Sequence, residues 1–146
     1  MNNKKSKDSQ GKSNADGSVY RHEKYILSYD NENDILYLKL LGLVYAEDLP
    51  EFIPRYQKLL ADKPRRYLLI DMVESVKMDP STLNKEMRNA YKELLDQIDI
   101  DKAAIFGTTP AMRMVARIAL ALSKWSNTTK FFKTEDEALG WLKEES

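Results

Sequence analysis

Apolar residues gather in short runs from Val19 onward, and their spacing changes between that of strands and that of helices. Two runs rich in aromatic and branched residues, Lys24–Tyr29 and Asp34–Leu40, flank the turn formers Asp30–Asn33. Two such runs joined by a short polar segment predict an antiparallel β-hairpin. Two further runs, Arg66–Met72 and Lys102–Gly107, show no alternation, which is typical of strands buried on both faces.

A helix is predicted from Glu47 to about Ala61, because apolar residues recur there at steps of three, four and one and share a face. This face comprises Leu49, Phe52, Ile53, Tyr56, Leu59 and Leu60. Pro50 suits the first turn of a helix, whereas Pro54 would remove an internal hydrogen bond and is expected to kink or delay the helix.

Capping residues predict the remaining helices. Asp79-Pro80 is expected to open a second helix, since Asp is a favoured N-cap and Pro a favoured first residue. Its expected core stripe is Leu83, Met87, Ala90, Leu94 and Ile98. A third helix is expected from Ala111 to about Lys124, a last strand at Thr129–Phe132, and a closing helix after a capping box at Thr134–Glu137.

This order of elements predicts an α/β fold: a mixed sheet of about five strands with an N-terminal antiparallel hairpin, and about four helices. The 146 residues fit one domain, which we place at residues 19–146. Residues 1–18 are mainly Lys, Asn, Ser, Gly and Asp, and we expect them to form a disordered N-terminal tail.

Composition narrows the classes of function. The chain has no cysteine and one histidine, His22, so thiolate chemistry and a histidine metal site are excluded and no cofactor is expected. Lys plus Arg (23) balance Asp plus Glu (23), which makes nucleic acid an unlikely partner. No run of apolar residues is long enough to cross a bilayer and no secretory signal is present, so we expect a cytoplasmic protein without a transmembrane segment. Phosphate-loop and nucleophile-elbow motifs are also absent from the sequence, and we expect no enzymatic activity.

Three stretches resemble the STAS domain, the module of sulfate transporters and anti-sigma-factor antagonists such as the SpoIIAA-like proteins, some of which are grouped with lipid-binding CRAL-TRIO folds. Leu68–Leu83 resembles the central strand and the loop that in this family ends in Asp-Ser-Ser-Gly-Leu. Thr108–Leu122 resembles the turn in which a small polar residue and Pro precede an Arg-bearing helix. Thr134–Leu139 resembles the final acidic cap before Ala-Leu. Together these stretches extend the likeness over roughly Lys24 to Lys143.

The resemblance implies that Ser81 is a phospho-acceptor within a loop read by a partner protein, to which Met78, Asp79 and Thr82 also belong. Pro80 replaces the first Ser of the family motif and Thr82 replaces its Gly, which narrows access for a partner backbone. From the residues alone, Ser81 also fits an ordinary serine in the first turn of a helix.

The segment from Lys102 to Lys133 carries six basic residues and no acidic one. Thr108, Thr109, Arg113 and Arg117 are its candidate anion-binding residues, for a phosphate, an anionic lipid or an acidic protein surface. The alternative is a solvated helix face. Six apolar residues of the same helix are interpreted as core: Met112, Met114, Val115, Ile118, Ala119 and Leu122. Asp71, at the end of a buried strand, is expected to stabilise a turn.

The sequence thus favours a non-enzymatic regulatory or protein-interaction module similar to anti-sigma-factor antagonists, for which the resemblance implies a switch by phosphorylation. The alternative is a small-ligand or lipid-binding module of the CRAL-TRIO-related kind, which would need an internal cavity.

Overall fold

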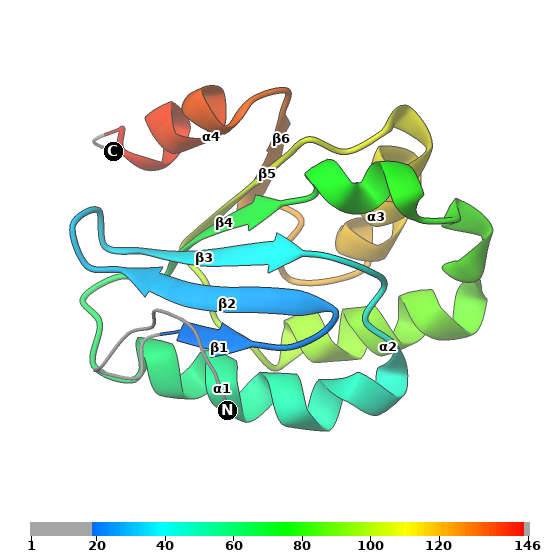
Figure 1. Ribbon diagram of the computed structural model, residues 1–146, viewed down its shortest axis with the longest axis horizontal. Coiled ribbons are helices and arrows are strands. Elements are labelled where there is room, and N and C mark those ends of the chain that lie inside the picture. The colour runs from blue at the N-terminus through cyan, green and yellow to red at the C-terminus, as the bar shows by residue number, and fades with distance from the viewer. Residues whose placement is uncertain (1–18, 145–146) are drawn as a thin grey trace, which may run out of the picture.

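A six-stranded mixed sheet forms the centre of the computed structural model, which describes residues 19–144 (Figure 1). The strands lie side by side in chain order. They are β1 (Val19–Arg21), β2 (Tyr25–Asp30), β3 (Ile35–Leu40), β4 (Tyr67–Asp71), β5 (Lys102–Phe106) and β6 (Thr129–Phe132). The α/β class and the N-terminal hairpin are confirmed, with one strand more than the expected five. The disordered tail predicted at residues 1–18 lies outside the described residues.

The additional strand is β1, which pairs antiparallel with β2 so that Val19 lies opposite Ser28. Three residues are too few to show the alternation that identifies a strand in sequence. The hairpin of β2 and β3 is turned by the Asp30 carboxylate, whose Oδ1 accepts backbone hydrogen bonds from Glu32 (2.9 Å) and Asn33 (3.2 Å). The predicted turn formers therefore act as expected.

Three helices cover one face of the sheet, and α4 (Glu135–Leu142) covers part of the other (Figure 1). The three are α1 (Leu49–Leu60), α2 (Lys85–Asp96) and α3 (Pro110–Ala121). β3 to β6 are parallel and each crossover steps in the same direction, so right-handed connections place all three crossover helices on the same face. The larger core lies between these helices and the sheet.

Two predicted helices have the expected form. α1 buries the apolar face foreseen for it, with Ile53 only partly buried, and the helix continues through Pro54. At the start of α4 the Thr134 hydroxyl accepts a hydrogen bond from the Glu137 backbone (3.2 Å), and the Glu137 carboxylate accepts one from the Thr134 backbone (3.4 Å). The capping box is confirmed.

The predicted start of the second helix is wrong. Asp79 and Pro80 open only a short 3-10 turn, η4 (Pro80–Thr82), and α2 begins at Lys85. Asn84 is the N-cap of α2, because its side-chain oxygen accepts a hydrogen bond from the Met87 backbone (3.0 Å). The sequence contains two consecutive capping signals, and the second starts the helix.

The core assigned to the third helix is only half right. Met112 and Ala119 are buried, but Met114, Ile118 and Leu122 are 65%, 46% and 59% exposed. α3 is apolar around most of its circumference, so spacing alone could not indicate which side faces the sheet. The exposed residues follow one another at steps of four and form a continuous apolar stripe on the outer side of the helix.

Candidate functional site

The loops that follow β4 and β5 pack against each other at the carboxyl edge of the sheet. The backbone N–H of Met72 donates to the carbonyl of Phe106 (2.9 Å), and the backbone N–H of Thr109 donates to Oγ of Ser75 (3.3 Å). Ser75 is buried within the 3-10 helix η3 (Val73–Lys77). The loop carrying Ser81 and the start of α3, which the sequence indicated separately, thus belong to one structural unit.

Gly107 allows this close approach. It adopts a φ of +83°, and a Cβ atom at this position would lie 2.7 Å from Cγ2 of Val73 and 3.0 Å from its backbone nitrogen. Glycine is needed for the backbone conformation and for the contact with Val73.

Ser81 is exposed, and Asp79 fixes its conformation. Oδ1 of Asp79 accepts hydrogen bonds from the hydroxyl (2.8 Å) and the backbone N–H (3.0 Å) of Ser81. These two donors, the backbone N–H first, hold the pKa of the Asp79 carboxyl below its usual value. Ser81 lies in η4 and not in the first turn of α2, so the helix dipole of α2 would not offset a phosphate at this position.

The other residues predicted to form the partner loop lie around this turn. Met78 is half-buried and lines an apolar cavity between the sheet and the crossover helices, which is described below. Thr82 is half-buried within η4. η4 packs beside α3, so the turn and the basic helix are neighbours. The phospho-acceptor and partner roles themselves stay predictions.

The candidate anion-binding residues lie at the start of α3, where Thr108 and Thr109 are, and along the helix, where Arg113 and Arg117 are. Thr109 is the N-cap of α3, since its hydroxyl accepts a hydrogen bond from the Met112 backbone (3.2 Å), and Thr108 is half-buried beside it. Arg113 and Arg117 lie one turn apart on α3, and the guanidinium of Arg117 stands 5.2 Å from the ring centre of Phe131. Anion binding by these residues stays a prediction.

Exposed apolar side chains accompany these polar residues. Val73 and Val76 of η3 are 50% and 71% exposed, and Met114 on the neighbouring α3 is 65% exposed. We call Val73, Val76, Ser81, Arg113 and Met114 the edge surface, because all of them lie on η3, η4 and α3, the elements that follow β4 and β5. Exposed apolar side chains rimmed by polar ones are typical of interaction sites.

Asp71 stabilises the turn that starts this region, as expected. Its Oδ1 accepts a hydrogen bond from the Val73 backbone (2.9 Å) and its Oδ2 accepts one from the Tyr37 hydroxyl (2.9 Å). The carboxylate is 6% exposed and belongs to the scaffold. Burial, followed by the hydrogen bond to Asp71, raises the pKa of the Tyr37 phenol well above its usual value.

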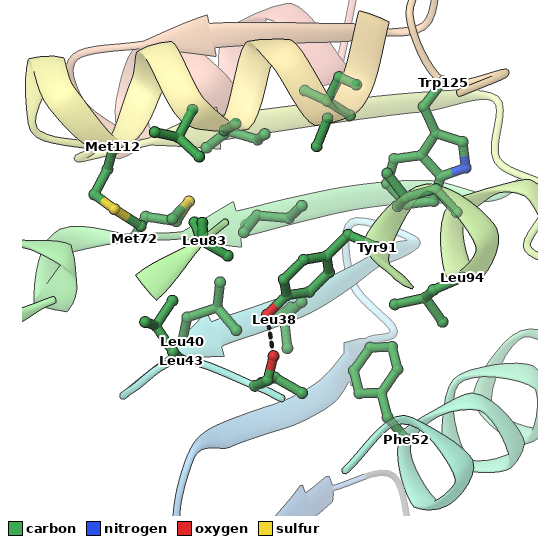
Figure 2. Close-up of a pocket in the computed structure, with 18 of the residues that line it drawn as sticks. Leu38, Leu40, Leu43, Phe52, Met72, Leu83, Tyr91, Leu94, Met112 and Trp125 are labelled. Atoms are coloured by element: carbon green, nitrogen blue, oxygen red, sulfur yellow. Dashed lines mark hydrogen bonds between the residues drawn. The ribbon is translucent and has the colours of Figure 1, made fainter. Parts of the chain in front are cut away.

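A cavity of about 170 Å³ lies between the sheet and the three crossover helices (Figure 2). Its walls are almost entirely aliphatic and aromatic, and Figure 2 shows side chains from the sheet (Leu38), α1 (Phe52), α2 (Tyr91, Leu94) and α3 (Met112) converging on it. No sequence signal indicated this space, because the same apolar residues would be needed for a filled core.

Four polar side chains contribute to the cavity wall among the described residues. Three of them donate to backbone carbonyls: Tyr91 to Val44, Trp125 to Ile98 (3.0 Å) and Arg88 to Leu83 (2.7 Å). The fourth is Tyr56, whose buried hydroxyl has no hydrogen-bond partner within the described residues, and burial raises its pKa. Arg88 is the one charged residue of the wall in residues 19–144, and it is half-buried.

Residues 19–144 contain neither a cluster of metal-ligating side chains nor a helix suited to a membrane. No three His, Asp or Glu side chains in this part of the chain are placed to hold a metal ion. None of its helices has the length and apolar character required to span a membrane.

Comparison with known proteins agrees with this architecture. A family model described as SpoIIAA-like matches residues 35–143. A solved structure from Shewanella loihica PV-4, an uncharacterized DUF3478-family protein with a SpoIIAA-like fold, superimposes with a TM-score of 0.56. It is 21% identical in sequence, and the match covers 81% of this chain and 91% of that one. No curated protein matches this chain.

Proposed function

This chain belongs to the SpoIIAA-like family, and from that premise we propose that it is a non-enzymatic regulatory module that binds a partner protein through its edge surface. The observation that carries the proposal is the exposure of three apolar side chains on elements next to the Ser81 turn: Val73 and Val76 on η3, and Met114 on α3. Apolar side chains in such a position gain free energy when a partner removes them from water.

We further propose that phosphorylation of Ser81 switches this binding, as in anti-sigma-factor antagonists. The Ser81 hydroxyl lies 2.8 Å from a carboxylate oxygen of Asp79 and donates to it. A phosphate would replace this donor by roughly two negative charges beside the same carboxylate. Repulsion would open the turn that Asp79 closes and would change the surface that the partner contacts.

Site-directed variants distinguish the edge surface from the rest of α3. We expect Met114→Gln to reduce recovery of the partner in a pull-down from the native cell at least severalfold. Leu122→Gln is the matched control, because Leu122 is also exposed (59%) but is the C-cap residue at the opposite end of α3. Equal recovery by wild type, Met114→Gln and Leu122→Gln would contradict the proposed interface.

The switch has its own test. Ser81→Asp and Ser81→Ala should fold alike but recover the partner to different extents, whereas Ser126→Asp, at an exposed serine distant in sequence from the loop, should behave as wild type. A native mass spectrum of protein purified from its own cell should also contain a species heavier by one phosphate. Identical recovery by both Ser81 variants would contradict the switch.

A small-ligand module of the CRAL-TRIO-related kind is the second candidate, and the apolar cavity beneath α2 is the observation that favours it.

A further inference from the structure

The cavity has the size of a small-molecule site. An engineered apolar cavity of about 150 Å³ in another protein stays dry and binds benzene. At about 170 Å³, the cavity found here can hold a ligand part of about six to eight carbon atoms. This is much smaller than a diacyl lipid.

Most residues that line the cavity belong to the larger core, and they leave this space unfilled. Protein interiors contain few voids larger than a water molecule, and each void forfeits dispersion contacts around its wall. Tyr91 extends from α2 toward the loop after β3 and donates to the carbonyl of Val44, so its ring forms part of the wall instead of filling the space (Figure 2). The hydrogen bond to Val44, which also lines the cavity, holds the ring in this position, and an apolar guest would recover the missing contacts.

Arg88 gives this apolar space a polar boundary. It is half-buried, lines the cavity near Leu83, and donates from Nη1 to the Leu83 carbonyl (2.7 Å). A guanidinium has five N–H donors, and Arg88 forms no ion pair with the described residues. Donors therefore remain for a carboxylate, which matches a guanidinium in geometry and charge.

We propose that the cavity binds a small amphiphile, with a short aliphatic tail inside the apolar space and a carboxylate head on Arg88. Hexanoate is the simplest ligand of this class. The proposal concerns a site separate from the edge surface, so it can fail while partner binding stands, and the reverse is also true.

The two tryptophans provide a direct test. Trp125 lines the cavity, whereas Trp141 packs in the core on the opposite face of the sheet. A bromine atom quenches indole fluorescence only at short range, so 6-bromohexanoate should quench Trp125 alone. We expect saturable quenching in wild type and in Trp141→Phe. In Trp125→Phe, quenching should not exceed that of free tryptophan in solution at the same ligand concentration. Absence of saturable quenching in the wild-type protein would overturn the proposal.

The head group is tested by changing the charge at Arg88. Arg88→Gln should weaken hexanoate binding at least tenfold while leaving 1-hexanol, which has the same tail and no charge, within about twofold. Arg88→Lys should restore part of the hexanoate affinity, and Lys58→Gln, at an exposed position of α1 that does not line the cavity, is the control for loss of a positive charge. An equal loss for hexanoate and hexanol, or no loss at all, would overturn the assignment of the head to Arg88.

Tail length is tested with straight-chain carboxylates. Each methylene that enters the cavity should tighten binding about fourfold, and the gain should stop once the space is full, at about six to eight carbon atoms. Ala116→Met, at a cavity-lining position on α3, should move this limit to shorter chains, with thermal melting as the check on folding. An affinity that keeps rising to twelve carbons in both proteins would overturn the cavity as the tail site.

Discussion

Ser75 accepts a hydrogen bond from the backbone N–H of Thr109 at 3.3 Å, and this contact joins the loop after β4 to the first turn of α3. Thr109 in turn caps α3 through its hydroxyl. The orientation of α3, and of the arginines it carries, is therefore set by the same loop that presents Ser81. A change in one part of the edge surface should alter the conformation of the other, because the connection is short and partly buried.

Replacing Gly107 by Ala should destabilise the protein by about 2 kcal/mol or more, because a side chain would be forced into a left-handed conformation and against Val73. Gly42→Ala is the matched control, since a Cβ there would meet no atom within 4 Å. Chemical denaturation measures both free energies of unfolding. Equal stability of the two variants would show that the loops around Gly107 can separate at little cost.

Tyr56 and Tyr91 line the same cavity and should respond in opposite ways to the loss of their hydroxyls. Tyr56→Phe removes a buried hydroxyl that has no partner in residues 19–144, so the free energy of unfolding should stay unchanged or rise by about 1 kcal/mol. Tyr91→Phe removes the hydrogen bond to Val44 and should lower the free energy of unfolding by about 1 kcal/mol. A loss of stability in Tyr56→Phe as large as that in Tyr91→Phe would indicate that the Tyr56 hydroxyl is bonded in solution.

Ser81→Ala should raise the pKa of Asp79 part of the way toward its usual value. Both donors from Ser81 favour the carboxylate, which is why the Asp79 pKa is lowered, and the variant removes the hydroxyl but keeps the backbone N–H. The turn is closed above the pKa of a free aspartate and opens as the pH falls through the lowered pKa. A carbon-detected NMR titration of the Asp79 carboxyl measures the shift, and an unchanged or lower pKa in Ser81→Ala would contradict this assignment.

Much of the fold followed from sequence because local signals and burial agreed. The hairpin turn at Asp30–Asn33, the unbroken apolar runs of β4 and β5, and the capping box at Thr134 each have one plausible structure. The start of α2 failed because Asp79 and Asn84 are both good N-caps, and only the tertiary position of the loop decides between them.

The site was less accessible to sequence reasoning for a different physical reason. Met112 and Met114 are equivalent in the hydrophobic pattern of the sequence, yet Met112 is fully buried and Met114 is 65% exposed. Which side of an apolar helix faces the sheet depends on the direction of the crossover, and a cavity depends on how well side chains from distant segments fit together. Helix orientation and cavity formation both depend on distant parts of the chain. The spacing of apolar residues in the sequence therefore could not predict the edge surface or the cavity beside Arg88.

The segment from Lys102 to Lys133, which has six basic residues and no acidic one, gives a prediction about charge. Arg113→Ala with Arg117→Ala should leave the fold intact and weaken binding to anionic vesicles or acidic proteins, with the difference shrinking as salt is raised. Loss of the contact between Arg117 and Phe131 should lower the free energy of unfolding by only about 0.5–1 kcal/mol. Vesicle co-sedimentation at two salt concentrations measures the binding, and unfolding of the double variant would show instead that the arginines are structural.

The cavity and the phospho-acceptor loop share residues, which couples the two proposals. Met78 and Leu83 line the cavity and lie on either side of Ser81 along the chain. Ser81→Asp places a second carboxylate beside Asp79 and should open the turn between these two wall residues, so the hexanoate dissociation constant should increase about fivefold, the lower end of usual coupling. Asn31→Asp, at an exposed position of the turn between β2 and β3, should leave it unchanged, as the control for added charge. Fluorescence titration of Trp125 in the three proteins measures the coupling, and equal dissociation constants in all of them would show that the ligand and the loop act independently.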